Sequence, residues 1–411
     1  MIGRISAKYA FRSLGRHPRR TVLSILGVGI GCALGMIAVA YYGGAAEMQI
    51  RAACESGTGH LRIVPDGWTE TQENSLRLTD WQAALAAARK TPHLKSAAVR
   101  ARVNGLLAFG NRTAGVEVLG VLPNVEREAN RIVAKSELEG RYLQPGDRGA
   151  VVIGKALARR LDVELDDDLM VTLSGQDEMR SAMWRIVGIL ATGSREIDES
   201  ICHVLLEELN EVSGFDAAGE IALLLDDHEF IEPAREYLDE RLGQRNTVIT
   251  WKQINRAVAA NIEGDTAFIN LMSAIVVLVV ILGITSAQLA AVLERRKEFA
   301  ILTAVGLKAR HLTGVLMLEA LLTGVAGAVA AMLLGGPVAY WIATEGINIG
   351  EFFGGEFAME GVLFDPIIYG DFGPWIILYA LSVSVAGTLA AMIYPAWFAV
   401  RTNPADALRT V

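Results

Sequence analysis

Cysteine and histidine are scarce in this sequence, and neither is arranged as a set of ligands. The 411 residues include three cysteines and six histidines, with no CxxC pair and no Cys/His spacing typical of a zinc site. Cys32, Cys54 and Cys202 are too few for a disulfide framework, so we expect them to be small packing residues. The GxSxG and HExxH motifs are also absent. The sequence therefore gives no reason to expect a hydrolase or a metal-dependent enzyme.

The sequence also contains fewer basic than acidic residues. Lys and Arg number 38 against 46 Asp and Glu, for a formal net charge of −8. Binding to a nucleic-acid backbone needs a face with an excess of cations, so this partner class is excluded. The acidic run at residues 166–168 lacks the alternating spacing and the distal Glu of a calcium loop, and we interpret it as a solvated turn.

Long hydrophobic runs, by contrast, are prominent. The chain is 52% hydrophobic, and its mean hydropathy is +0.34. Four runs reach the length of about 20 apolar residues that a membrane-spanning helix needs: residues 21–46, 267–293, 312–344 and 374–400. We predict that each run is a transmembrane helix, because only a helix satisfies its own backbone groups in lipid.

The charges beside these runs predict their orientation, since loops rich in Lys and Arg stay in the cytoplasm. Residues 1–20 and 294–311 are rich in Lys and Arg, whereas residues 345–371 hold six acids and neither Lys nor Arg. Both termini, 1–20 and 401–411, and the 294–311 loop are thus predicted to be cytoplasmic. Residues 47–265 and the short acidic loop 345–373 are then extracytoplasmic.

The N-terminal segment has its own pattern. Arg4, Lys8, Arg12 and Arg16 recur at every fourth position and would form one basic stripe on a helix. This predicts an amphipathic helix on the membrane surface, with an ordinary basic leader as the alternative. A cleaved secretory signal is a further alternative, but the first run is longer than the usual apolar core of about 7–15 residues. We therefore interpret this run as a retained anchor.

Small residues at four-residue spacing mark the runs. They allow helix backbones to approach closely in lipid, so we predict that the helices bundle or dimerise on them. The predicted packing residues are Gly27, Gly31, Gly35, Gly283, Ala287, Gly327, Ala331 and Gly335. Glu319, the one charged residue within a run, is within helical reach of the cytoplasmic interface. We predict a structural hydrogen-bonding role for it rather than a proton relay.

The segment between the first two runs is long enough for a folded domain with its own core. Apolar runs predict strands at residues 60–64, 116–121, 150–153, 169–173, 184–190 and 221–225. Helical patterns cover residues 80–90, 155–161 and 230–242, the first with Thr79 as its N-cap. The fold class is thus a membrane protein with four transmembrane α-helices and a large α+β extracytoplasmic domain, of two lobes, inserted between helices 1 and 2.

Three segments carry a resemblance to a known family: AFRSLGRHPRRTVLSILGVGIG at 10–31, ERRKEFAILTAVGLKARHLTGVLMLEALLTGVAG at 294–327, and YPAWFAVRTNPADALR at 394–409. Together they resemble the FtsX/MacB-type permeases of ABC transporters. Within that family, SGTGHLRIV at 56–64, EVLGVLPNVEREAN at 117–130 and AVVIGKALARRLDVELDDDLMVTL at 150–173 resemble the lipoprotein-releasing, LolC/LolE-like branch.

The resemblance implies that the 294–311 loop is the coupling helix for an ATPase. Its residues are Glu294, Arg295, Arg296, Lys297, Glu298, Phe299, Ile301, Leu302, Val305 and Gly306, with an apolar stripe facing a groove of the partner. The pattern alone also allows a helix resting on lipid headgroups. No GxxxxGK[ST] phosphate loop occurs, so we expect no cofactor in this chain and a separate ABC ATPase subunit, in two copies, that binds ATP and magnesium.

The resemblance further implies a permease of the bacterial inner membrane that pairs with itself or with a related permease. Its expected partners are thus the ATPase, a second permease, membrane lipid and a lipoprotein or other lipid-bearing cargo. Drug or peptide efflux is an alternative function, and so is an FtsX-like scaffold that regulates a cell-wall hydrolase. A membrane sensor would need a cytoplasmic output domain, for which the cytoplasmic segments predicted here are too short.

Overall fold

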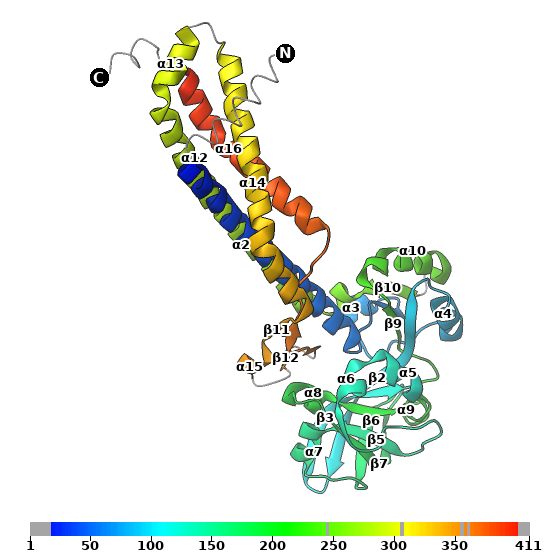
Figure 1. The fold of residues 1–411 in the computed structure, drawn as a ribbon. Coiled ribbons are helices and arrows are strands. Elements are labelled where there is room, and N and C mark those ends of the chain that lie inside the picture. The colour runs from blue at the N-terminus through cyan, green and yellow to red at the C-terminus, as the bar shows by residue number, and fades with distance from the viewer. Residues whose placement is uncertain (1–17, 244–245, 305–307, 354–356, 360–361, 402–411) are drawn as a thin grey trace. The chain divides into compact units, whose positions relative to one another are not determined.

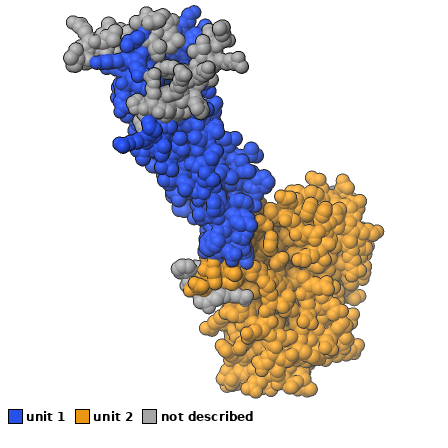
Figure 2. Space-filling view, viewed as in Figure 1, with its two compact units in different colours: residues 1–46, 263–347, 368–411 blue, residues 47–262, 348–367 orange. Residues whose placement is uncertain are grey.

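The computed structural model describes residues 18–243, 246–304, 308–353, 357–359 and 362–401 (Figure 1). The chain divides into two compact units (Figure 2). Unit 1 comprises residues 1–46, 263–347 and 368–411, and unit 2 comprises residues 47–262 and 348–367. The segment 348–367, predicted as part of a plain acidic loop, is thus grouped with the large inserted domain.

Unit 1 contains most of four long helices, of which the first two continue into unit 2: α2 Pro18–Glu55, α12 Arg256–Glu294, α14 Ala309–Thr344 and α16 Trp375–Arg401. All four are long and apolar enough to cross a membrane, by length and composition. A short helix, α13 Arg296–Ala304, follows α12. Helix α2 continues past the first apolar run to Glu55, and α12 begins before the second run. Hydropathy therefore located the apolar part of each helix but not its polar extension.

Helix α14 packs closely against its neighbours in unit 1 through small residues. A Cβ added to Gly335 would lie 2.6 Å from Met36 Cε on α2, and one added to Gly327 would lie 2.5 Å from Val28 Cγ1. Ala331, between them, is fully buried. Substitution of either glycine would therefore push α2 and α14 apart.

The other predicted packing residues divide into two groups. Gly31 and Gly35 of α2 face Val280 and the Tyr379 hydroxyl, and Ala287 is half-buried. An added Cβ would meet nothing within 4 Å at Gly27 or Gly283 among the described residues. Sequence reasoning missed Gly29, whose added Cβ would lie 2.7 Å from Ala330 Cβ on α14. Because Gly29 is two residues from Gly27 and Gly31, it falls outside their four-residue spacing.

Unit 2 contains a ten-stranded sheet with the order β10-β1-β9-β2-β3-β8-β5-β7-β4, and β6 pairs with β2 and β7. Its strands are β1 Leu61–Pro65, β2 Leu94–Phe109, β3 Arg112–Val121, β4 Glu137–Gly140, β5 Ala150–Gly154, β6 Asp168–Ser174, β7 Met179–Ala191, β8 Cys202–Leu205, β9 Glu220–Leu225 and β10 Asn246–Thr250. All six predicted strands are confirmed, as β1, β3, β5, β6, β7 and β9. The chain also forms short strands β11 Ile347–Asn348, β12 Phe357–Met359, β13 Val362–Phe364 and β14 Ile367–Ile368.

Short helices fill the connections of unit 2. They are α3 Trp68–Thr71, α4 Trp81–Ala88, α5 Pro123–Ala129, α6 Arg131–Lys135, α7 Lys155–Leu161, α8 Arg195–Ser200, α9 Leu206–Ser213, the 3₁₀ turn His228–Phe230, α10 Ile231–Leu242, α11 Trp251–Ile254 and α15 Gly350–Phe353. The helices predicted at 80–90, 155–161 and 230–242 are confirmed as α4, α7 and α10. Both α and β elements are therefore mixed along this domain.

The predicted N-cap of α4 is wrong by one residue. Asp80, not Thr79, caps the helix, and its carboxylate accepts a hydrogen bond from Ala83 N–H. The backbone N–H and carbonyl of Thr79 instead bond the side-chain amide of Asn246 on β10, at 3.3 and 2.9 Å. The backbone of Thr79 is thus bonded to a strand of the sheet, and the next polar residue, Asp80, is the N-cap.

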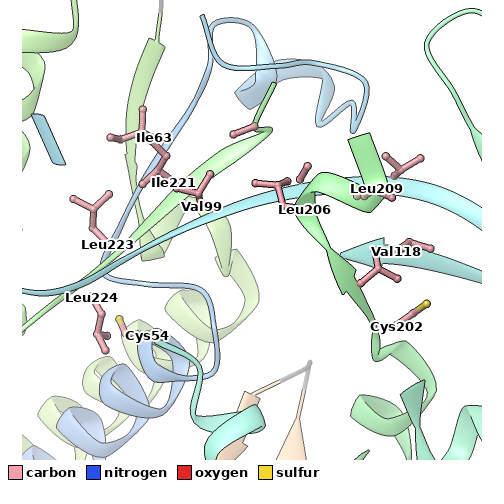
Figure 3. Close-up of a cluster of buried hydrophobic side chains, with 14 of the residues drawn as sticks. Cys54, Ile63, Val99, Val118, Cys202, Leu206, Leu209, Ile221, Leu223 and Leu224 are labelled. Carbon is pink, nitrogen blue, oxygen red and sulfur yellow. The ribbon is translucent and has the colours of Figure 1, made fainter. Parts of the chain in front are cut away.

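Strand β2 connects the two parts of the sheet. Its first half pairs with β9, and its second half pairs with β3 and β6. Figure 3 shows the apolar core on this framework, with Ile63, Val99, Ile221 and Leu223 at one end and Val118, Leu206 and Leu209 farther along. Cys54 and Cys202 are buried here as free cysteines, as expected for packing residues. A second apolar cluster is formed around Val121, Val152 and Leu190.

Arginine–glutamate pairs interrupt this core on its central strands. Arg100 of β2 and Glu126 of α5 are each 1% exposed and are joined by two hydrogen bonds of 2.8 and 3.0 Å. Burial alone would raise the pKa of Glu126, but the Arg100 guanidinium outweighs burial and lowers it. Both groups therefore remain charged inside the domain, where each compensates the desolvation of the other.

A second group of charges lies on β1, β2, β3 and β9. Glu220 accepts from Arg62 Nη1 at 2.9 Å and from Arg102 Nη2 at 3.3 Å, and Arg102 also pairs with Glu117. Burial would raise the pKa of Glu220, yet the charges of Arg102 and Arg62 hold it at about 2. Two arginines and two glutamates are thus balanced within this part of the sheet.

Two buried histidines of unit 2 are held neutral. Burial lowers the pKa of His60 and of His203 to about 4. His60 Nδ1 accepts a hydrogen bond from Leu225 N–H at 3.1 Å, and His203 Nδ1 lies 3.0 Å from the Tyr142 hydroxyl. Protonation of His60 would remove the acceptor, so its hydrogen bond requires the neutral ring.

We predict that the free energy of unfolding falls as the pH decreases from about 6.5 to about 4. The unfolded chain binds protons at these histidines in that window, whereas the folded chain does not. Denaturant unfolding of the full chain in detergent at several pH values measures the slope. His203→Gln should reduce it, because one of the two buried neutral rings is then absent. An equal slope in wild type and His203→Gln would contradict the prediction.

Candidate coupling segment

The chain remains helical from α12 into α13, but its sequence changes from apolar to partly charged. Arg295 lies between α12 and α13, and its N–H still bonds the Ala291 carbonyl at 3.3 Å. Phe299 N–H in turn bonds the Arg295 carbonyl at 3.1 Å. The hydrogen-bond pattern of a helix therefore crosses the junction, so α13 is joined to α12 without a loose loop.

Arg295 is the anchor of this segment. It is 8% exposed, and its Nη1 lies 3.3 Å from Oε2 of Glu319, which is 6% exposed, on α14. Its Nε lies 3.5 Å from Glu298 Oε2, and its guanidinium carbon is 5.0 Å from the centre of the Phe299 ring. The hydrogen-bonding role predicted for Glu319 is confirmed, and its partner Arg295 is the cation that directly follows the second helix.

The apolar side of α13 is divided between the interior and the surface. Phe299 and Ala300 are buried, and Phe299 packs in a cluster with Leu312 and Leu316 of α14 and Met392 of α16. Ile301, by contrast, is 54% exposed. The expected stripe facing a partner is therefore corrected at Phe299, because that side chain already fills the core of unit 1. Ile301 remains available for an external contact.

The charged residues of the segment mostly face outward. Glu294, Lys297 and Glu298 are exposed, and Arg296 is half-buried. The side chain of Leu302 and the whole of Val305 and Gly306 lie outside the described residues, as do Arg4, Lys8, Arg12 and Arg16. The described part thus presents charges and one apolar side chain on a helix held to α14 by a buried ion pair.

We predict that removing either partner of the Arg295–Glu319 pair destabilises unit 1 by about 3–5 kcal/mol, because the other charge is left buried. Arg295→Ala, Glu319→Ala and the double variant form a cycle, measured by thermal unfolding in detergent. The double variant should lose less than the sum of the single variants. Lys297→Ala, at an exposed cation of the same segment, is the control. Additive losses would refute the predicted coupling.

Within the described ranges, no cluster of three or more His, Cys, Asp or Glu side chains is placed to hold an ion.

Comparison with known protein families matches nearly the whole chain. The MacB-like periplasmic core domain model matches residues 21–241, just over half of the sequence. The FtsX-like permease C-terminal model matches residues 270–404, which includes the coupling segment.

Individual relatives extend over both parts. The lipoprotein-releasing system transmembrane protein LolC of Xylella fastidiosa is 24% identical over 398 residues, which cover 95% of this chain and 93% of that protein. The macrolide export ATP-binding/permease protein MacB 2 of Aeromonas hydrophila is 26% identical over 417 residues, covering 98% of this chain and 60% of that protein. Among solved structures, the periplasmic region of MacB from Actinobacillus actinomycetemcomitans is 16% identical with a TM-score of 0.37, and the match covers 51% of this chain and 95% of that one.

Proposed function

Because the chain belongs to the FtsX/MacB-type family of ABC-transporter permeases, we propose that it relays the ATP-driven motion of a separate ATPase subunit to its periplasmic domain. The observation that supports this most is the coupling segment. It exposes Ile301 beside charged side chains, while Arg295 and Phe299 fix it to α14 and α16. A push on the exposed face therefore moves the helices rather than deforming a loop.

The proposed location is the bacterial inner membrane, with both termini and α13 in the cytoplasm and the bulk of unit 2 in the periplasm. The basic residues of the N-terminal and 294–311 segments support this orientation. All three natural cysteines are buried, which favours a labelling test with a low background.

We predict that Lys297→Cys reacts with a membrane-impermeant maleimide only after the inner membrane is opened. Arg89→Cys, at an exposed position of unit 2, should react in intact spheroplasts. The measurement is gel-shift labelling of each variant before and after permeabilisation. Labelling of Lys297→Cys in intact spheroplasts would overturn the proposed orientation.

The proposed assembly contains two ATPase subunits and a second permease, identical or related. Helix α12 supports the pairing, because 6% of its most apolar window is buried in this chain, compared with 50% for α14. Its uncovered residues include Leu271, Ile275 and Val279. Helix α12 thus leaves an apolar surface for a second permease or for lipid.

We predict that Ile301→Glu lowers capture of the ATPase subunit from the same organism by about tenfold or more, since a charge replaces the exposed apolar contact of α13. Ile301→Val keeps the contact and serves as the matched control. Pull-down from detergent extracts and ATP-hydrolysis rates of the mixture measure the effect. The purified chain alone should not hydrolyse ATP. Equal capture by both variants would contradict docking at this segment.

For the cargo, we favour a lipoprotein released from the inner membrane. The similarity to LolC supports this choice, because it extends over nearly the full length of both proteins. Export of a small molecule is the second candidate, supported by the similarity to MacB 2. ATP-dependent release of a labelled lipoprotein from spheroplasts, compared with macrolide sensitivity of a deletion strain, separates the two.

A further inference from the structure

A basic hollow in unit 2 is not used by the coupling mechanism. It has a volume of about 980 Å³, which is within the range of sites for medium-sized ligands. Helices α6, α7 and α8 contribute to its wall, and α7 and α8 are neighbours at one edge of the domain in Figure 1. Its cations are Lys135, Lys155, Arg159, Arg160 and Arg195.

The acids in and beside the hollow neutralise only some of these cations. Asp198 accepts hydrogen bonds from the backbone and hydroxyl of Thr192, at 2.9 and 2.7 Å. Glu199 pairs with Arg195 at 2.8 Å, and Glu137 is exposed. Lys135 pairs with Asp365 at 3.4 Å. These pairs occupy two of the five cations of the hollow.

The remaining three cations all belong to α7. Lys155, Arg159 and Arg160 make no ion pair with any residue that the structure describes. Lys155 and Arg159 are four residues apart and share a face of the helix, and Arg160 follows directly. Three uncompensated positive charges on one short helix, within a chain of net charge −8, create a local attraction for anions.

An adjoining cavity extends the site toward the centre of unit 2. Its volume is about 490 Å³, and it shares Arg160 and Glu199 with the basic hollow. Arg62, which also lines it, is 5% exposed, and its Nε is buried without a hydrogen-bond partner among the described residues. Arg160 thus lines both the hollow and this cavity.

We propose that the basic hollow and the adjoining cavity bind a phosphate-bearing anion, with Arg159 and Arg160 as its principal contacts. Guanidinium groups form paired hydrogen bonds with phosphate oxygens, which favours phosphate over a simple halide. The three cations of α7 line one concave volume, which suits a compact anionic group better than an extended acidic chain. The headgroup of an anionic lipid and free phosphate share this chemistry.

The test uses the full chain in a neutral detergent and a phosphate-free, low-salt buffer. Isothermal titration measures binding of inorganic phosphate, dihexanoyl phosphatidylglycerol and a polyglutamate peptide. Arg159→Gln/Arg160→Gln is compared with Arg89→Gln/Lys90→Gln, an adjacent exposed pair of cations outside the hollow. Both double variants remove the same charge, so they separate the site from a general charge effect.

We expect the Arg159/Arg160 variant to weaken binding of the phosphate probes by about tenfold or more, because charge-assisted hydrogen bonds are lost. The control variant should bind like wild type. Tighter binding of the phospholipid than of phosphate identifies the source as a lipid headgroup, and equal binding identifies free phosphate. Equal losses in both variants, no binding of either phosphate probe, or binding of polyglutamate alone would overturn the proposal.

All residues of the proposed anion site belong to unit 2. Loss of ATPase capture in the Ile301 variant and loss of anion binding here are therefore separate results, and failure of one leaves the other standing.

Discussion

A buried arginine paired with a glutamate is the interaction on which both units depend. In unit 1 it joins Arg295 to Glu319, and in unit 2 it joins Arg100 to Glu126. Such a pair contributes little net stability compared with apolar packing, because both charges are desolvated. The pair instead determines geometry, because each charge can be buried only where the other charge lies beside it. The pairs therefore fix which segment lies against which.

In unit 1 this constraint has a mechanical consequence. Lipid cannot drive helix association by the hydrophobic effect, so α2 and α14 rely on close contact at Gly327, Ala331 and Gly335. These contacts fix α2 against α14, but they do not fix the position of α13, which follows α12. The Arg295–Glu319 pair and the buried Phe299 ring complete the connection. Helix α13 is thereby fixed to α14 and α16.

The sequence predicted a helix or strand correctly where its apolar residues follow the pattern of that element. Four apolar runs located the long helices, and six apolar runs located strands. Strand β2 was missed because Arg100 and Arg102 break its apolar pattern, and both are compensated by glutamates distant in the sequence. The same reason hid the partner of Glu319, since a pairing across 24 residues leaves no local signal. Phe299 was assigned to a partner because composition cannot tell an inward from an outward apolar side chain.

Net charge and local charge answer different questions. Binding to a nucleic-acid backbone neutralises many phosphates and therefore needs many cations along an extended face. A single compact anion needs only a few cations that converge. Helix α7 supplies them because Lys155, Arg159 and Arg160 have no acids beside them on their own helix. Many of the acids that give the chain its net charge lie outside the hollow, and water and salt screen the exposed ones over a short distance. An acidic protein can therefore hold a basic hollow, and the sign of the total charge does not predict the sign of a site.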